Sequence, residues 1–260
     1  MAASIARVLR AWEETWLSPT TLPARERLAR SGWEPDEADS YCDRCGATLG
    51  AYEGDEFGCA SCRDRRVPWA RFVRLGAFDE PLDEWVRSIK FGRDRAMGRA
   101  LGRMLGESLQ HAGATDGLDG GCVLVPVPMH WRRRVSRGIE HARVLARSAS
   151  AVTGVPTECV LRKSSRETQR GRSLEARKRN IKGAMRARGR IGEAQRVVLI
   201  DDVATSGETL REGVRALRAR FGQDLEVWIG VVAVTAEPSR RRAIEVGQGG
   251  QGVDEMVVGG

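Results

Sequence analysis

The sequence has no long apolar run, although a membrane-spanning helix needs roughly 20 apolar residues. Charged residues also interrupt its first 16 positions, so the apolar segment of a signal peptide is missing. These absences argue against a membrane protein and a secreted one, and we expect a cytoplasmic protein without membrane insertion. The chain has 260 residues, of which 41% are hydrophobic, enough for a substantial core.

Acidic residues are scarce in one part of the chain. The whole sequence carries a net charge of +8, but residues 131–190 hold 18 basic and only four acidic residues, an excess of +14. A local excess of this size predicts a polyanionic ligand, such as a phosphorylated metabolite or a nucleic acid. The alternative is a solvated surface in a chain that prefers arginine to lysine.

Four of the six cysteines form two CxxC pairs, Cys42 with Cys45 and Cys59 with Cys62. Two such turns complete a tetrahedral shell of four sulfurs without an open position, so we expect a structural Zn²⁺ site. Redox-active CxxC motifs and disulfides are the alternatives. Two copies joined by a short hydrophilic loop argue against the first, and a cytoplasmic chain argues against the second. Because this segment has almost no apolar core, metal binding would supply its folding energy.

Hydrophobic patterns predict alternating helices and strands over much of the remaining chain. Stretches that are apolar on both faces predict buried strands, and the helices between them indicate a largely parallel sheet. The expected strands are 122–127, 155–161, 197–200 and 226–235. The expected helices are 2–17, 82–111 with a break near Gly92, 139–152, and one that follows the strand at 197–200.

The stretch VVLIDDVATSGETL at 197–210 places polar groups directly after a buried strand. Asp201 and Asp202 end the strand, a loop of small hydroxylated residues follows, and a helix then begins. Ligands of open parallel sheets bind at the carboxyl ends of the strands, and a helix N-terminus after a glycine-containing turn offers N–H groups to a phosphate. Carboxylates repel phosphate but accept hydrogen bonds from a diol. The sequence therefore predicts a ribose that carries a 5′-phosphate.

The same stretch resembles the motif with which type I phosphoribosyltransferases bind phosphoribosyl pyrophosphate (PRPP). The resemblance implies that Asp201 and Asp202 bind the ribose hydroxyls. It also implies a 5′-phosphate loop made of Ala204, Thr205, Ser206, Gly207, Glu208 and Thr209. A generic strand–loop–helix unit with capping residues is the alternative, but it accounts for single residues better than for the full string.

Further motifs, in the same order along the chain, resemble the ComF family of competence-associated, phosphoribosyltransferase-like proteins. The resemblance runs from about Tyr41 to Val234 and includes the CxxC pairs, SIKFGRDRAMGRALGRML, VPVPMHWRRRVSRG and QRGRSLEARKRNIKGAM. It implies an α/β fold with a type I phosphoribosyltransferase-like parallel sheet, flanking helices and a small N-terminal zinc ribbon. We expect an N-terminal helix and linker (1–39), a four-cysteine zinc ribbon (40–66), a phosphoribosyltransferase-like domain (67–240) and a flexible tail (241–260).

The resemblance also implies a mechanism. The bond from ribose C1′ to pyrophosphate loosens before the nitrogen nucleophile is fully bonded, so catalysis is mostly positioning and leaving-group stabilisation. Mg²⁺ would bridge pyrophosphate and ribose oxygens. His130 and His141 are candidates for a general acid, but a surface or capping role is our expectation for both. The candidates for holding pyrophosphate are Arg132, Arg133, Arg134 and Arg137.

Three functions remain open at this stage. The first is an enzyme that transfers phosphoribosyl from PRPP to an unidentified acceptor, which the acid pair and the phosphate loop favour. The second is a non-catalytic competence protein that uses the PRPP fold as a binding or regulatory module, with single-stranded DNA as a partner. The zinc ribbon and the basic segment favour this second function. The third is a sensor that binds PRPP or a nucleotide without turnover.

Overall fold

The structure is a computed structural model, which describes residues 23–50, 53–55, 57–91, 94–116, 121–129, 140–163 and 183–235. Its elements belong to two units. Helix α2 (Ala24–Ser31) belongs to the first unit, Met1–Glu34, and all other elements belong to the second, Pro35–Gly260. The helix expected over 2–17 and the tail expected over 241–260 lie outside the described residues.

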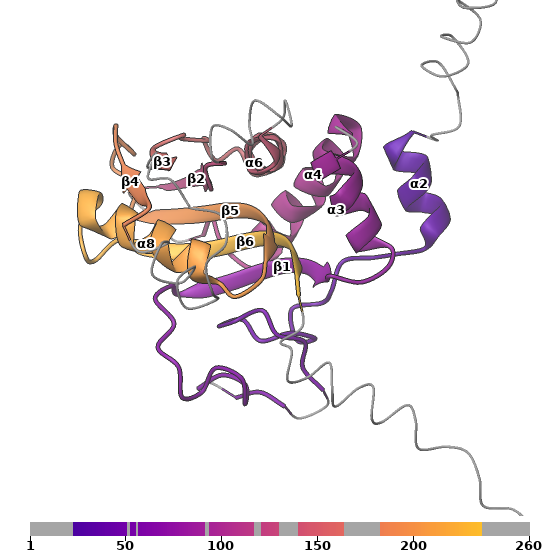
Figure 1. The fold of residues 1–260 in the computed structure, drawn as a ribbon, viewed down its shortest axis with the longest axis horizontal. Helices are drawn as coiled ribbons and strands as arrows, with labels where there is room; N and C mark the ends of the chain where they lie inside the picture. Colours follow the sequence, from indigo (N-terminus) through magenta and orange to yellow (C-terminus); the bar gives the residue numbers. More distant parts are fainter. Residues whose placement is uncertain are drawn as a thin grey trace, which may run out of the picture. The chain divides into compact units, whose positions relative to one another are not determined.

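Four parallel strands form the main sheet of the second unit, in the order β1-β6-β5-β2 (Figure 1). Every neighbouring pair is parallel, so the carboxyl ends of all four strands lie along one edge. Strand β5 is interior, and its Ile200 pairs with Pro126 of β2 and with Gly230 of β6. The largely parallel sheet expected from the sequence is confirmed. The strands are β1 (Arg71–Ala77), β2 (Cys122–Pro126), β5 (Arg196–Ala204) and β6 (Glu226–Val234).

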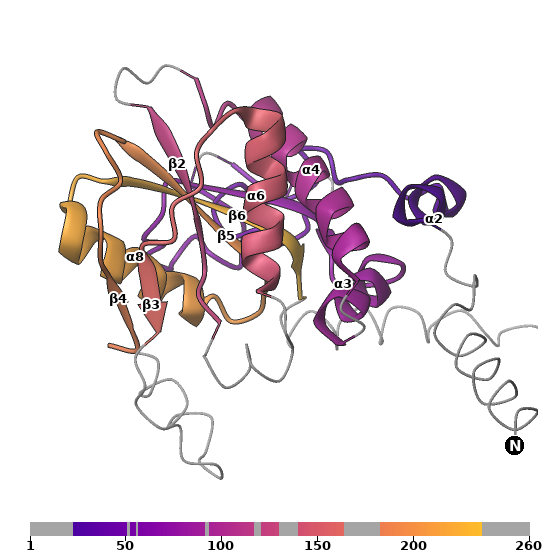
Figure 2. The same cartoon turned by 90° about the horizontal axis from the view of Figure 1, so that it is seen from above.

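Helices cover both faces of this sheet (Figure 2). Alternate side chains of β5 face opposite ways: Leu199 packs against Gly213 of α8 (Glu208–Phe221), and Ile200 lies on the face covered by α4 (Arg95–His111). Helix α6 (His141–Thr153) lies beside α4 on that second face, and α3 (Leu82–Phe91) precedes α4. Two helices therefore occupy the region expected to be helical over 82–111. None of the helices in the described ranges is both long and apolar enough to cross a membrane.

Helices α4 and α6 approach closely because glycines of α4 face α6. A Cβ added at Gly102 would lie 2.7 Å from Cβ of Ser148 and 2.8 Å from the carbonyl oxygen of Leu145. At Gly106, an added Cβ would lie 2.9 Å from Cα of Ala149. Real side chains do not tolerate such distances, so any larger residue at either position would push the two helices apart.

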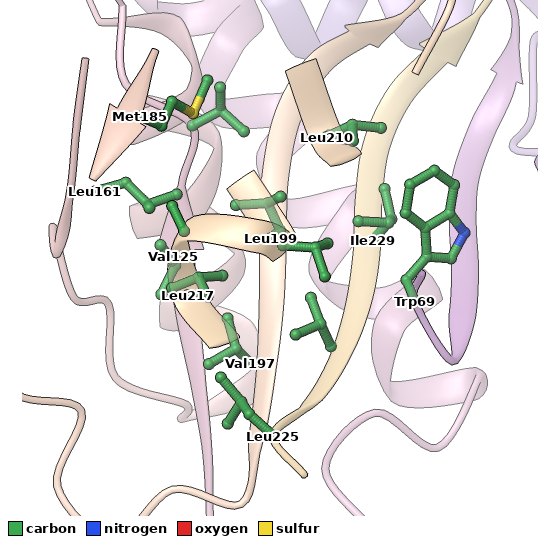
Figure 3. Close-up of a cluster of buried hydrophobic side chains, with 14 of the residues drawn as sticks. Trp69, Val125, Leu161, Met185, Val197, Leu199, Leu210, Leu217, Leu225 and Ile229 are labelled. Atoms are coloured by element: carbon green, nitrogen blue, oxygen red, sulfur yellow. The ribbon is translucent and has the colours of Figure 1, made fainter. Parts of the chain in front are cut away.

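A small two-stranded sheet, β3 (Leu161–Lys163) with β4 (Met185–Ala187), closes the core on the α8 side. Leu161 and Met185 belong to the same buried cluster as Leu199 of β5 and Leu217 of α8 (Figure 3). The α8 helix therefore packs against both the main sheet and this antiparallel pair, and the position of its N-terminus depends on both.

One expected strand is wrong, and two observed strands, β1 and the short β4, were not expected. Residues 155–160 form only an isolated bridge, between Thr157 and Leu124, and β3 begins at Leu161. Pro156 has no N–H to donate, which limits pairing at this point. Strand β1 was missed because the charged Arg74 interrupts its apolar pattern.

Glu212 on α8 is 4% exposed, and its hydrogen bonds hold β4 against the helix. Its Oε1 accepts the Met185 N–H at 2.9 Å, and Arg215 donates to both carboxylate oxygens at 2.7 Å. Arg215 also donates to the Met185 carbonyl at 3.0 Å. Burial alone would raise the pKa of Glu212, but the hydrogen bonds from Arg215 and the Met185 amide outweigh it and hold this pKa below its ordinary value.

We expect Glu212→Ala to lower the free energy of unfolding by about 3 kcal/mol, because it leaves the Met185 amide and the Arg215 guanidinium without their acceptor. Urea unfolding of the variant against Glu158→Ala, which removes an exposed carboxylate, measures this difference. Because the pKa of Glu212 is lower in the folded protein than in the unfolded chain, this stabilisation is complete above the ordinary pKa of a glutamate. It should be lost as the pH falls through the lowered folded-state pKa. If both variants lose the same free energy of unfolding, the hydrogen bonds of Glu212 stabilise the fold no more than an exposed carboxylate does.

Candidate functional site

Asp201 and Asp202 lie near the carboxyl end of β5, on the edge where all four parallel strands end. The backbone holds one oxygen of each carboxylate: Asp201 Oδ1 accepts the Asp202 N–H at 2.9 Å, and Asp202 Oδ1 accepts the Val203 N–H at 2.7 Å. Within the described part of the chain, neither Oδ2 has a partner, and neither is among the buried polar atoms that lack one. A ligand with two adjacent hydroxyls fits this pair of acceptors.

The residues after the acid pair form a turn that leads directly into α8. Ala204 is the buried last residue of β5, Thr205 and Ser206 are exposed, and Gly207 has a φ of 71°. Glycine adopts this left-handed conformation without strain. Glu208 and Thr209 are the first two residues of α8, so the turn lies beside the unpaired N–H groups of a 14-residue helix. This arrangement suits an anion.

The ionisation of the acid pair is uneven. Burial, and then the neighbouring Asp202 carboxylate, raise the pKa of Asp201 to about 8, while the charges of Lys90 and Lys163 act in the opposite direction. Near neutral pH, Asp201 is therefore mostly protonated. One protonated and one ionised carboxyl group give the site both a donor and several acceptors.

Lys90 is a charged neighbour of this pair that sequence reasoning missed. It lies near the end of α3, and its Nζ is 3.3 Å from Asp202 Oδ1. A lysine in an amphipathic helix gives no signal of its own in a single sequence.

The arginines expected to hold pyrophosphate, Arg132, Arg133, Arg134 and Arg137, lie outside the described residues, as does His130. His141 begins α6 and is 1% exposed, so the surface alternative is wrong for it, while the capping alternative stays a prediction.

The four cysteines of the CxxC pairs come together in one cluster, in which all four sulfurs lie within 4.8 Å of one another. Sulfur–sulfur distances are 3.7 Å for Cys42–Cys62, 3.5 Å for Cys45–Cys59 and 3.9 Å for Cys59–Cys62. A tetrahedron with metal–sulfur bonds of about 2.3 Å has edges of about 3.8 Å. The hydrogen bond between the Cys45 and Cys42 thiols lowers the pKa of Cys42 and raises that of Cys45, so the sulfurs of this cluster are coupled in their ionisation.

The buried Arg74 of β1 joins the sheet to the cysteine segment, which runs from Asp36 to Cys62. This side chain is 2% exposed, and it donates to Asp36 Oδ2 at 2.5 Å, to the Gly46 carbonyl at 2.7 Å and to Thr48 Oγ1 at 2.9 Å. Its guanidinium also lies over the Tyr41 ring, 5.1 Å from the centroid. The charge of Arg74, which hid β1 in the sequence, is therefore paired with the Asp36 carboxylate, although its buried Nε has no hydrogen-bond partner among the described residues.

Comparisons with known proteins agree with this arrangement. The phosphoribosyl transferase domain family matches residues 135–246. Competence protein F of Haemophilus influenzae is 31% identical over 192 residues, which cover 72% of this chain and 82% of that protein. DNA utilization protein YhgH of Escherichia coli is 30% identical over 191 residues, which cover 73% and 82%.

A similar solved structure is the glutamine phosphoribosylpyrophosphate amidotransferase from B. subtilis, complexed with ADP and GMP. The match has a TM-score of 0.30 and 21% identity, and covers 51% of this chain. The chain spans about a quarter of the length of that enzyme, 25%. Identity of about 30% to the competence and DNA utilization proteins over most of their length, together with the transferase domain, shows that this chain belongs to the ComF family.

Proposed function

We propose that this protein binds PRPP and transfers its phosphoribosyl group to an acceptor that the sequence does not identify. The observation that carries the proposal is the Asp201–Asp202 pair at the end of an interior parallel strand, followed at once by the Gly207 turn and the N-terminus of α8. A ribose 5-phosphate carries a diol and a phosphate close together, and the two halves of the site match these two groups.

In this proposal the acid pair binds the sugar and the turn binds its phosphate. One ribose hydroxyl donates to the unpartnered oxygen of Asp202, and the other exchanges a hydrogen bond with the protonated carboxyl group of Asp201. The N–H groups at the start of α8, and the exposed hydroxyls of Thr205 and Ser206, donate to the 5′-phosphate. With both ends held, C1′ is fixed in place while the bond to pyrophosphate breaks, which is the positioning that such a reaction requires. PRPP would bind as its Mg²⁺ complex, in which the cation offsets the pyrophosphate charge.

We propose Zn²⁺ as the ion of the cysteine cluster, held by Cys42, Cys45, Cys59 and Cys62. The sulfur–sulfur distances support a tetrahedral four-sulfur shell, and such shells have no open position for substrate. The metal would therefore stabilise the segment and take no part in the transfer reaction.

Calorimetric titration of the wild-type protein with PRPP and Mg²⁺ tests the binding step. Saturable binding of one PRPP per chain, with competition by ribose 5-phosphate, is expected. Release of pyrophosphate in the presence of individual nucleobases then tests transfer. Absence of PRPP binding would overturn the proposal, and binding without release with any acceptor would reduce it to a PRPP sensor.

We expect Gly207→Ala to weaken PRPP binding at least about tenfold, a loss of about 1.4 kcal/mol. An added Cβ at Gly207 would lie 3.7 Å from the Trp69 ring, an ordinary contact, so steric clash within the protein is not the cause. The φ of 71° instead disfavours alanine, and the turn must change shape where the phosphate approaches the backbone.

Gly154→Ala is the matched control for that variant. Gly154 caps the end of α6 with a φ of 72°, and an added Cβ there has no neighbour within 4 Å. Both variants should lose about 1 kcal/mol of stability from the same backbone strain, but only Gly207→Ala should lose PRPP affinity. If the two variants bind PRPP equally well, the turn is not the phosphate site.

Binding of single-stranded DNA is a second candidate function. The names of the relatives, competence protein F and DNA utilization protein, favour it. A pocket of about 470 Å³ beside α8 also favours it, because Arg66, Arg211, Arg215 and Arg218 line it. Phosphate contacts release counterions, so the logarithm of the DNA affinity should fall linearly with the logarithm of salt concentration. Fluorescence anisotropy at several salt concentrations checks this slope, and a salt-independent signal would contradict phosphate binding.

A further inference from the structure

Lys90 brings a positive charge to the acid pair from outside the matched transferase domain, which begins at residue 135. Its ammonium nitrogen lies 3.3 Å from Asp202 Oδ1, and the two side chains are 21% and 18% exposed. Water and salt therefore screen this ion pair less than they screen a surface pair. The contact joins α3 to β5, two elements far apart in the sequence.

The neighbouring ion pair on α3 has a different character. Arg87, three residues before Lys90, pairs with Asp83 of the same helix at 2.9 Å, and the Arg87 side chain is 62% exposed. A pair with one exposed partner at this spacing adds little to the stability of a helix. Arg87 pairs within its own helix and lies over the Phe78 ring, whereas Lys90 reaches a carboxylate at the carboxyl end of the sheet.

The contact fixes which oxygen of Asp202 is available. Asp202 Oδ1 is engaged by two groups, the ammonium of Lys90 and the Val203 N–H. Asp202 Oδ2 has no partner among the described residues. With Oδ1 held from two sides, the carboxylate cannot rotate freely about its χ2 bond, and Oδ2 keeps one position.

We propose that Lys90 is a positioning residue of the sugar site, which orients the Asp202 carboxylate so that Oδ2 accepts a ribose hydroxyl. The inference rests on the proposed function, because it assumes that a ribose occupies the acid pair. Lys90 acts through Asp202 and need not touch the ligand.

The charges around the pair give this role a distinct signature. In the described part of the chain, the charged groups that act most on Asp201 are Asp202 of β5, Lys90 of α3 and Lys163 of β3. The carboxylate neighbour raises the pKa of Asp201, and the two lysines lower it. Removal of Lys90 therefore moves the titration of Asp201 to higher pH, an effect that loss of packing alone does not produce.

The test compares three variants by calorimetric titration with PRPP and Mg²⁺ across a range of pH. Lys90→Met keeps most of the side-chain length without the charge, and should weaken binding at least about tenfold and move the midpoint of the affinity profile to higher pH. Lys90→Arg keeps the charge and should remain within about threefold of wild type. Arg87→Met removes a cation from the same helix and should leave affinity and profile unchanged.

A ligand-free measurement separates this inference from the proposed function. Carboxyl carbon NMR should show the Asp201 titration at higher pH in Lys90→Met than in the wild type. If the wild type fails to bind PRPP, the proposed function fails, and the NMR titration alone decides whether Lys90 controls the acid pair. Wild-type affinity in Lys90→Met, or an unshifted titration in this variant, would overturn the inference.

Discussion

Replacement of both Asp201 and Asp202 by asparagine should abolish measurable PRPP binding. Hydrogen bonds to a charged carboxylate contribute about 1.5–3 kcal/mol each, so loss of the ionised acceptor and its neighbour should cost at least about a hundredfold in affinity. Asparagine matches aspartate in shape, and Asp201 is mostly protonated near neutral pH. The fold should therefore tolerate the change. Calorimetric titration of the double variant measures the effect.

Asp224→Asn is the appropriate control for the double variant. Asp224 is exposed and precedes β6, at the opposite edge of the sheet from the acid pair. The Asp224→Asn variant should retain wild-type PRPP affinity. Both this variant and the double variant should keep the metal content of the wild type and a melting temperature within a few degrees of it. Full PRPP affinity in a folded double variant would refute the assignment of Asp201 and Asp202 to the ribose. This conclusion would hold whether or not the Gly207 turn binds the phosphate.

The strand, turn and helix of this site could be predicted from the sequence because their signals are local. An apolar run followed by Asp201, Asp202 and Gly207 fixes a strand end, an acid pair and a turn within a few consecutive positions. The cysteine cluster is local in the same sense, since each CxxC pair forms one turn and the two pairs need only meet.

The parts that the sequence did not predict depend on contacts between distant segments. Arg74 makes β1 look unlike a buried strand, and its partners Asp36 and Thr48 come from another segment of the chain. Lys90 likewise has ordinary helical spacing, and its role depends on a contact with β5. A pattern read along one element carries no information about charges that another element brings to it.

Cys42→Ser should remove the metal and release the cysteine segment from the sheet. A serine hydroxyl does not replace a thiolate ligand, and structural Zn²⁺ in small sites contributes about 10–16 kcal/mol at neutral pH. Plasma mass spectrometry should show a fall from about one zinc per chain to almost none. Cys159→Ser removes a thiol outside the cluster and should keep the metal. Full metal occupancy in Cys42→Ser would rule out the four-sulfur site.

The effect of metal loss should extend to the sheet through its outer strand. The Phe72 N–H of β1 donates to the Asp43 carbonyl, and the Leu75 carbonyl accepts the Asp36 N–H, so this segment covers an edge that would otherwise be open to pairing with another chain. Its release would also leave the buried charge of Arg74 unpaired, a cost of about 3–5 kcal/mol. Hydrogen exchange at Phe72 should therefore accelerate in Cys42→Ser, and the variant should aggregate more readily. Unchanged protection at Phe72 would show that the segment stays in place without its metal.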